Sequence, residues 1–296
     1  AAVALFRAAR DSAGAAARLL PAAAVAAGPA HGRREPQVRA ALARAFACAR
    51  GGADDPRLRA AQPGAAGGGE RQRYTQDNHP GILAVREWAK EFGVWILLGS
   101  VHCYPGEGRE DKQYNRSLLV SPSGTIAAAY DKIHLFDVDV PGDRSYRESD
   151  KMLAGDKLVI ALLSTKHEEP STTLGLSICY DLRFPHLYRR LAKMGANILA
   201  VPAAFTQITG EAHWHVLLRA RAIENGCFVI APAQTGTHVD GRKTYGHSLV
   251  VDPWGRILAD GGTDVGIIYA EIDLGEVERV RARLPSLGHD RPFDSV

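Results

Sequence analysis

The sequence predicts an α/β protein in which mixed β-sheets are covered by helices. Two hairpin turns, at 121–124 and 252–255, each lie between short strand-like segments. Elsewhere, strand-like segments alternate with amphipathic helical segments, a connection that joins parallel strands. Hairpins and helical crossovers in one chain indicate sheets with both strand directions. With 296 residues, 46% of them hydrophobic, the chain is long enough to bury a full core.

The sequence gives no support for nucleic-acid binding, a membrane span, a phosphate loop, a disulfide framework or a structural zinc site. A net charge of +3 gives no indication of nucleic-acid binding. No apolar run is long enough to span a membrane, and no glycine-rich phosphate loop occurs. The four cysteines are far apart and form no CxxC pair. This spacing predicts neither a disulfide framework nor a structural zinc site, and it favours a reducing, cytoplasmic location.

The first 73 residues differ in composition from the rest of the chain. Ala, Arg, Gly and Pro dominate, whereas Ile, Thr, Tyr, Asn, Lys, Trp and Met are absent before Tyr74. Three interpretations stay open: a disordered or weakly helical extension, an organelle presequence within 1–34, or a degraded or out-of-frame domain start. Under the third, residues 2–6 predict a strand and residues 37–50 an amphipathic helix. We therefore divide the chain into an atypical segment, 1–73, and a globular domain, 74–296.

The elements of an α/β domain follow from Asp77 onward. Asn78 is expected to cap a helix that has Pro80 in its first turn and ends at Gly93. A second helix begins at Pro185, with Met194 on its apolar face. Two further helices are predicted at 212–224 and 274–284. Strands are predicted at 94–101, 114–120, 125–130, 174–178, 197–201, 228–231, 248–251, 256–259 and 265–272.

Cys179 lies where an apolar run, 174–178, gives way to the helix that begins at Pro185. An apolar run this short predicts a buried strand. A thiol at such a junction is held rigidly and can face a cleft, as the serine of a nucleophile elbow does. The alternative is a buried core cysteine, which is the common role of a cysteine beside a strand. The residues elsewhere in the chain decide between the two.

Four segments carry a resemblance to a known family. Residues 130–142 read YDKIHLFDVDVPG, residues 175–185 read GLSICYDLRFP, residues 205–225 read FTQITGEAHWHVLLRARAIEN and residues 245–255 read YGHSLVVDPWG. They resemble, in order, the lysine motif, the cysteine motif and two later blocks of the nitrilase superfamily, the carbon–nitrogen hydrolases. The similarity is to the Nit-type amidases, the branch with deaminated-glutathione amidase and ω-amidase. It extends from about residue 78 to residue 293, and four ordered motifs are unusually specific.

The resemblance implies a role for each residue of a site. Cys179 is expected to attack an amide carbonyl and release ammonia, after which water hydrolyses the thioester. Lys132 would favour the thiolate and, with the backbone N–H of Tyr180, stabilise the oxyanion. Glu148 corresponds to the family's second glutamate, beside the lysine. Without the motifs, Lys132 and Glu148 would be interpreted as solvated loop charges.

The resemblance also implies the fold and the partners. The expected fold is an α-β-β-α sandwich of two mixed sheets with helices outside, pairing through helices into a homodimer. The expected substrate is a small linear carboxamide, with neither metal nor cofactor. Phe205, Trp214 and Arg183 are expected to border the substrate.

The general base of the family is expected to be missing. The family pattern places an apolar strand and Pro-Glu after Gly-Ala-Asp, whereas here residues 52–54 are followed by DPRLRA at 55–60. Glu70 is the only glutamate between Ala60 and Asn78 and is therefore the candidate for a replacement base. Its glycine-rich surroundings do not resemble the end of a buried strand, which would hold a base within hydrogen-bond reach of the thiol. Two hypotheses follow: an amidase that uses Cys179, and a non-catalytic homologue that binds a ligand without efficient turnover.

Overall fold

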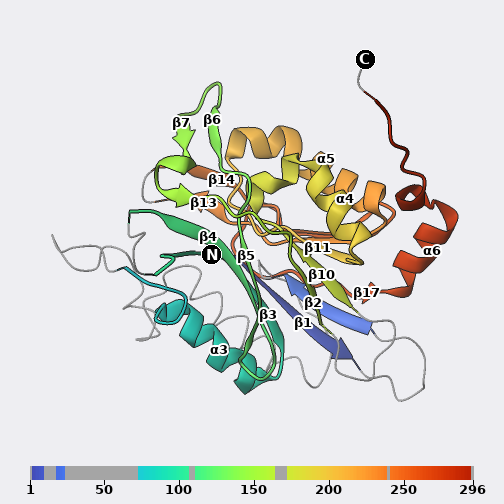
Figure 1. Cartoon of the computed structure of the whole chain (residues 1–296), viewed down its shortest axis with the longest axis horizontal. Helices are drawn as coiled ribbons and strands as arrows, with labels where there is room; N and C mark the ends of the chain where they lie inside the picture. Colours follow the sequence, from blue (N-terminus) through green and yellow to red (C-terminus); the bar gives the residue numbers. More distant parts are fainter. Residues whose placement is uncertain are drawn as a thin grey trace.

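The computed structural model of the chain describes residues 2–9, 18–23, 73–106, 111–163, 172–238 and 241–294 (Figure 1). These residues form four layers, with two β-sheets face to face in the middle and helices on the outside. The predicted α/β class and its α-β-β-α sandwich are confirmed. None of the described helices is long and apolar enough to cross a bilayer.

The first sheet contains both the first and the last strand of the described chain, β1 and β17. Its order is β17-β2-β1-β3-β4-β5, with β8 paired to β4. All neighbours are antiparallel except β8 and β4, which are parallel. The bounds are β1 Ala2–Ala9, β2 Arg18–Ala23, β3 Trp95–Cys103, β4 Gln113–Val120, β5 Ile126–Asp131, β8 Met152–Leu153 and β17 Ile272–Asp273.

The second sheet carries the cysteine elbow. Its order is β16-β15-β12-β11-β10-β9, and β10, β11 and β12 run parallel in its centre. Crossover helices link these three strands, whereas a hairpin turn links β15 to the antiparallel edge strand β16. The bounds are β9 Ile160–Leu162, β10 Thr173–Leu176, β11 Ile198–Ala200, β12 Phe228–Ala231, β15 Leu249–Val251 and β16 Ile257–Asp260.

Helices cover the outer faces of the two sheets, and α6 lies at one end of them (Figure 1). Helix α3 packs on the first sheet, and α4 and α5 pack on the second. Two small hairpins, β6–β7 and β13–β14, lie outside the sheets. The bounds are α3 Pro80–Phe92, α4 Pro185–Lys193, α5 Gln207–Asn225, α6 Gly275–Arg283, β6 Asp137–Asp139, β7 Ser145–Arg147, β13 Thr235–Thr237 and β14 Lys243–Tyr245, with 3₁₀ turns η1 Glu148–Asp150, η2 Cys179–Arg183 and η3 Ser286–Gly288.

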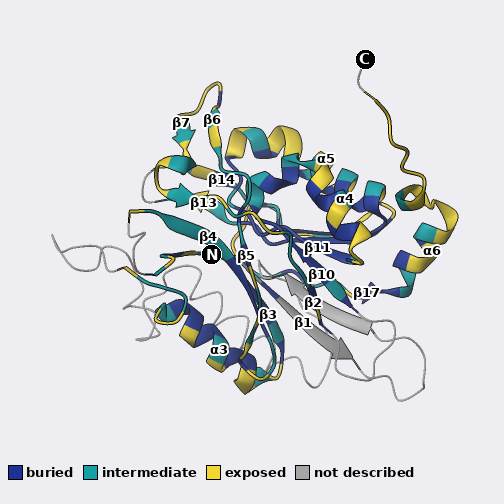
Figure 2. Cartoon of the chain, viewed as in Figure 1, coloured by how far each residue is buried: buried dark blue, intermediate teal, exposed yellow. Residues whose placement is uncertain are grey.

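Three apolar cores separate the four layers. One lies between α3 and the first sheet and is centred on Trp88. A second lies between the sheets, where Leu97 of β3 and Leu174 of β10 are buried together. The third lies between the second sheet and helices α4 and α5, around Trp214. Figure 2 shows buried residues on the helix sides that face the sheets. The central strands β11 and β12 are buried on both faces, which explains their continuous apolar runs.

The structure confirms most of the predicted elements and corrects four details. The cap of α3 is His79, whose ring accepts from the N–H of Gly81 at 3.1 Å, while Asn78 bonds Thr75 instead. Helix α5 begins at Gln207, five residues before the prediction. Met194 follows α4 and is 44% exposed. Of the last predicted strand, 265–272, only Ile272 lies in a strand, β17 Ile272–Asp273.

The two elements predicted within the first 73 residues have different outcomes. The predicted strand at 2–6 lies within β1, which pairs with β3 and with β2. The predicted helix at 37–50 lies outside the described residues, as does the stretch at 52–72 where the family base was sought.

Candidate active site

Cys179 lies at a sharp turn between β10 and α4. It is the first residue of η2, and its N–H donates to the carbonyl of Pro202 at 3.0 Å. Its backbone φ is +50°, a left-handed conformation that is uncommon for a residue other than glycine. Such strain is maintained only where the surroundings impose it, and it is common at reactive positions. The predicted elbow is therefore present, and the Cys179 side chain is only partly buried.

Lys132 follows directly on β5, and its side chain is almost fully buried. Its ammonium group forms an ion pair with Glu148. Its backbone is fixed on both sides, because its N–H donates to Asn115 at 2.9 Å and its carbonyl accepts from Gly155 at 2.8 Å. A buried lysine with one carboxylate partner is a fixed positive charge, which excludes the interpretation as a solvated loop lysine.

Glu148 opens η1 and is held by three donors. One carboxylate oxygen accepts from the Asn115 amide at 3.0 Å, and the other from the backbone N–H of Phe136 at 2.7 Å and from Lys132. Since an ionised carboxylate only accepts hydrogen bonds, these contacts fix its orientation. The Oδ1 of Asn115 is buried and has no hydrogen-bond partner among the described residues. Asn115 was not identified from the sequence.

Asp181 joins the lysine segment to the cysteine elbow. Its buried carboxylate accepts from the backbone N–H of Ile178 at 2.9 Å and from the Tyr130 hydroxyl at 2.7 Å. It also accepts from the backbone N–H of His134 at 3.0 Å and contacts the His134 ring at 2.7 Å. Residues on either side of Cys179 and of Lys132 are thereby tied to one carboxylate. Asp181 was not predicted as a site residue from the sequence, although it lies inside the cysteine motif.

The charges around Cys179 act in opposite directions on its thiol. Burial raises the pKa of Cys179, while the positive charge of Lys132 and a hydrogen bond from the backbone of Ala204 act to lower it. The negative charges of Glu148 and Asp181 add to the increase in its pKa. The lysine and the thiol are therefore within electrostatic reach of each other.

Tyr180 and Arg183 lie on the same short turn as Cys179. Tyr180 is in the first turn of η2, where N–H groups have no acceptor within the helix. The Arg183 guanidinium stacks over the rings of Phe205 at 5.2 Å and Tyr180 at 5.8 Å, and donates to His213 at 3.3 Å. Burial lowers the pKa of Arg183.

Phe205 and Trp214 are both buried and pack ring against ring, with centroids 4.9 Å apart. The Trp214 indole N–H donates to the carbonyl of His247 at 2.7 Å. Trp214 is fully buried, and it contacts Phe205, over whose ring the Arg183 guanidinium lies. The structure thus groups the three residues that were expected to border the substrate.

A cleft of about 500 Å³ is lined by residues that are close in sequence to Glu148 and Phe205. Its walls come from the segment that precedes β7 and Glu148, from the first turns of α5 after Phe205, and from the β13–β14 hairpin. Most of its polar side chains are charged, and the lining residues are Gly142, Asp143, Arg144, Gln207, Ile208, Glu211, Gly241, Arg242 and Lys243.

Comparison with known proteins identifies the family. The sequence pattern of the family described as carbon-nitrogen hydrolase matches residues 22–282. The chain belongs to the carbon–nitrogen hydrolase family. It is 50% identical over 201 residues to the deaminated glutathione amidase of Synechocystis, covering 68% of this chain and 72% of that protein. A deaminated glutathione amidase of Yersinia enterocolitica is 42% identical, covering 76% of this chain and 77% of its own.

Solved structures give the same fold. Saccharomyces cerevisiae Nit3, a member of branch 10 of the nitrilase superfamily, matches with a TM-score of 0.59 and 32% identity, covering 69% of each chain. A mutant amidase from Nesterenkonia sp. AN1 matches with a TM-score of 0.54 and 25% identity, covering 69% of this chain and 71% of that chain. That structure shows covalent addition of the acetamide moiety of fluoroacetamide at its active-site cysteine.

Family membership and the identity to amidases favour one of the two sequence-based hypotheses. The chain is an enzyme that hydrolyses non-peptide C–N bonds, and the non-catalytic alternative is not favoured.

Proposed function

We propose that this enzyme hydrolyses a small linear carboxamide through a thioester on Cys179, and that its substrate is of the deaminated-glutathione type. The identity of 42–50% to proteins named deaminated glutathione amidase supports this substrate class. An ω-amide of a short dicarboxylic acid has the same linear form and is the second substrate to test.

The reaction proceeds in two halves. The Cys179 thiolate adds to the amide carbonyl, and the negative charge moves to the carbonyl oxygen. The C–N bond then breaks, and the nitrogen takes up a proton equivalent to the one that the Cys179 thiol released, leaving as ammonia from a primary amide or as an amine from a substituted one. Water adds to the thioester, the C–S bond breaks, and the carboxylic acid departs.

Lys132 and the Tyr180 N–H are proposed as the groups that stabilise the tetrahedral oxyanion. Two observations support this role for Lys132: its side chain is buried, and its positive charge acts to lower the pKa of Cys179. Removal of one such donor typically lowers kcat about 10²–10³-fold. Glu148 is proposed to fix the ammonium group of Lys132. The Asn115 amide and the Phe136 N–H hold the Glu148 carboxylate, which forms the ion pair with Lys132. The free Oδ1 of Asn115 would accept an N–H from the substrate amide.

Recognition of the rest of the substrate is assigned to the charged cleft. A deaminated glutathione carries carboxylates at its ends, and Arg144 and Lys243 offer cationic partners at the cleft. Phe205 and Arg183 would border the acyl part, with Trp214 supporting Phe205 from behind.

The assembly proposed for the enzyme is a cytoplasmic homodimer that pairs through α5. Val216 and Ile223 lie seven residues apart, on one face of α5, and are 67% and 48% exposed. Large apolar side chains exposed on one helix face favour a protein contact. The proposed division of the chain stays at 1–73 and 74–296, with an organelle presequence within 1–34 as the alternative to a cytoplasmic location.

Product release from deaminated glutathione and from a set of ω-amides tests the proposal. Wild-type enzyme should release the amine or ammonia, whereas Cys179→Ala should release none above background. Cys103→Ala is the matched control, because Cys103 is a buried core thiol in β3 and should leave the rate unchanged. Undiminished turnover by Cys179→Ala would refute the assignment of the nucleophile.

A further inference from the structure

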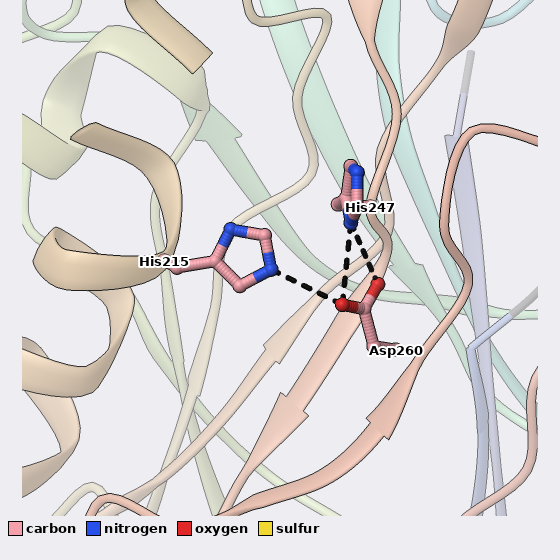
Figure 3. A group of neighbouring side chains, drawn as sticks. All are labelled: His215, His247 and Asp260. Carbon is pink, nitrogen blue, oxygen red and sulfur yellow. Dashed lines mark hydrogen bonds and ion pairs between the residues drawn. The ribbon is translucent and has the colours of Figure 1, made fainter. Parts of the chain in front are cut away.

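Three side chains of residue types that can ligate metals come together beside α5 from distant parts of the chain (Figure 3). His215 extends from α5, His247 lies in the segment before β15, and Asp260 ends β16. The Asp260 carboxylate is 3.1 Å from Nε2 of His215 and 2.9 Å from Nδ1 of His247. The proposed reaction at Cys179 uses none of these three residues.

The spacing of these atoms fits one small ion. A tetrahedral zinc site has bonds of about 2.0–2.1 Å, which places neighbouring ligand atoms about 3.3 Å apart. Measured from the one oxygen Oδ2 of Asp260, the separations are 3.1 Å to Nε2 of His215 and 3.2 Å to Nδ1 of His247, both within a few tenths of an ångström of that value. One ligand atom from each residue lies within 4.8 Å of the others. An ion can therefore be accommodated by small side-chain rotations.

The surroundings hold the cluster in place before any ion arrives. His247 has a φ of +53°, its N–H donates to Gly262 at 2.6 Å, and its ring stacks on Tyr245 at 4.3 Å. The Asp260 carboxylate accepts from the N–H of Gly262 at 2.9 Å. Second contacts of this kind fix the orientation of metal ligands and raise their affinity. A strained histidine that is over-determined by its neighbours also points to a function for its ring.

We propose that His215, His247 and Asp260 bind a divalent transition-metal ion of the zinc class, with water as the fourth ligand. Two imidazoles and one carboxylate favour Zn²⁺, Co²⁺ or Ni²⁺, whereas Mg²⁺ and Ca²⁺ prefer oxygen ligands alone. The three side chains are between about one fifth and one third exposed, which leaves a path for the ion and a position for water. The bound ion cross-links α5 to the edge of the second sheet.

The cross-link bears on the substrate side of the enzyme through one residue. Trp214 precedes His215, donates to the His247 carbonyl and packs on Phe205. An ion that fixes His215 against His247 therefore also fixes the indole that supports Phe205. We expect the ion to stabilise the fold and not to take part in the chemistry at Cys179.

Metal titration of the chelator-treated, full-length protein tests the proposal. Co²⁺ should produce the visible d–d absorption of a tetrahedral site, without the sulfur-to-metal charge-transfer bands that binding at Cys179 would give. Calorimetry with Zn²⁺ should give about one ion per chain for wild type and for Cys179→Ala alike. At a hundred times Kd, bound Zn²⁺ should raise the Tm by about 4 °C.

Three variants make the test specific. His215→Ala and Asp260→Asn should weaken binding by more than about a hundredfold, since they remove a ligand and not an outer partner. His289→Ala removes an exposed histidine outside the cluster and should bind as wild type does. Asp260→Asn preserves the side-chain shape, so a folded variant is available if His215→Ala fails to fold. No binding up to millimolar Zn²⁺, or binding unaffected by both variants, would overturn the proposal.

Discussion

Replacement of Asp181 with asparagine tests how the two halves of the active site are held together. The Asp181 side chain is fully buried, and each of its oxygens accepts from a backbone N–H, one from His134 and the other from Ile178. Asparagine has one acceptor oxygen and one NH₂ group in the same shape. Whichever way the amide turns, one of the two backbone N–H groups faces a donor.

The magnitude follows from that one lost bond. A buried N–H left without an acceptor costs about 1–3 kcal/mol of folding free energy. The same change loosens the tie between the Lys132 segment and the Cys179 turn, and a misplacement of about 1 Å lowers kcat by up to about a hundredfold. We therefore expect Asp181→Asn to lose both stability and kcat, with a smaller effect on KM.

Urea unfolding and steady-state kinetics measure the two effects separately. Asp252→Asn is the matched control, because Asp252 is also buried but holds the turn between β15 and β16 through Trp254 and Arg256. It should lower stability and leave kcat unchanged at a temperature where both variants are folded. If Asp181→Asn retains wild-type stability and kcat, the tie between the two segments is not what positions the site.

Three further predictions concern the backbone of the lysine segment, alkaline pH and assembly. In Gly155→Ala, the new Cβ would lie 2.2 Å from the backbone oxygen of Asp131, so the segment before Lys132 must move and kcat should fall. The control Gly288→Ala places its Cβ in open space and should leave kcat unchanged. Burial raises the pKa of both Cys103 and Cys227 to about 11 from 9.0, so the unfolded chain ionises first. Their contribution to stability is thus intact below pH 9 and is lost as the pH rises toward 11, and urea unfolding at pH 10 should show a loss of about 1 kcal/mol for each thiol. A stability that rises from pH 8 to pH 10 would contradict this. Val216→Glu should convert a dimer into a folded monomer in light scattering with unchanged circular dichroism, and a wild-type protein that is already monomeric would refute pairing through α5.

Local sequence signals were sufficient to predict elements whose cause is local. The two hairpin turns are correct because Gly124 and Gly255 supply the positive φ that such turns require. The end of α3 is correct for the same reason, with Gly93 in the left-handed conformation. The Cys179 turn was recognisable because a short buried strand and a proline-led helix flank it.

Elements that depend on tertiary contacts were predicted less well. The first turn of α5 contains Gly210, which discourages a helix assignment, yet Tyr245 packs so closely there that a Cβ would lie 2.3 Å from it. The last strand is short because β17 pairs only through Ile272 and Asp273 with β2. Its partner lies in the atypical N-terminal segment, which no local pattern connects to residue 272.

The site was predicted only where a motif carried it. The Lys132–Glu148 pair was expected from the motif and is present. The role of Asp181 depends on contacts 47 to 51 residues away, with His134 and Tyr130. The cluster of His215, His247 and Asp260 was missed because helical spacing relates residues only within α5. The other two residues come from beside and within the second sheet, since His247 precedes β15 and Asp260 ends β16.

Rapid-quench mass spectrometry during turnover of an amide tests the central claim most directly. We expect the acyl half of the substrate to appear on the peptide that contains Cys179, at a rate at least equal to kcat, and to disappear as the substrate is exhausted. Turnover of the amide with no acyl group on Cys179, or with the same rate in Cys179→Ala, would contradict it. An acyl group that forms and persists without product release would instead support a chain that binds and reacts but does not turn over.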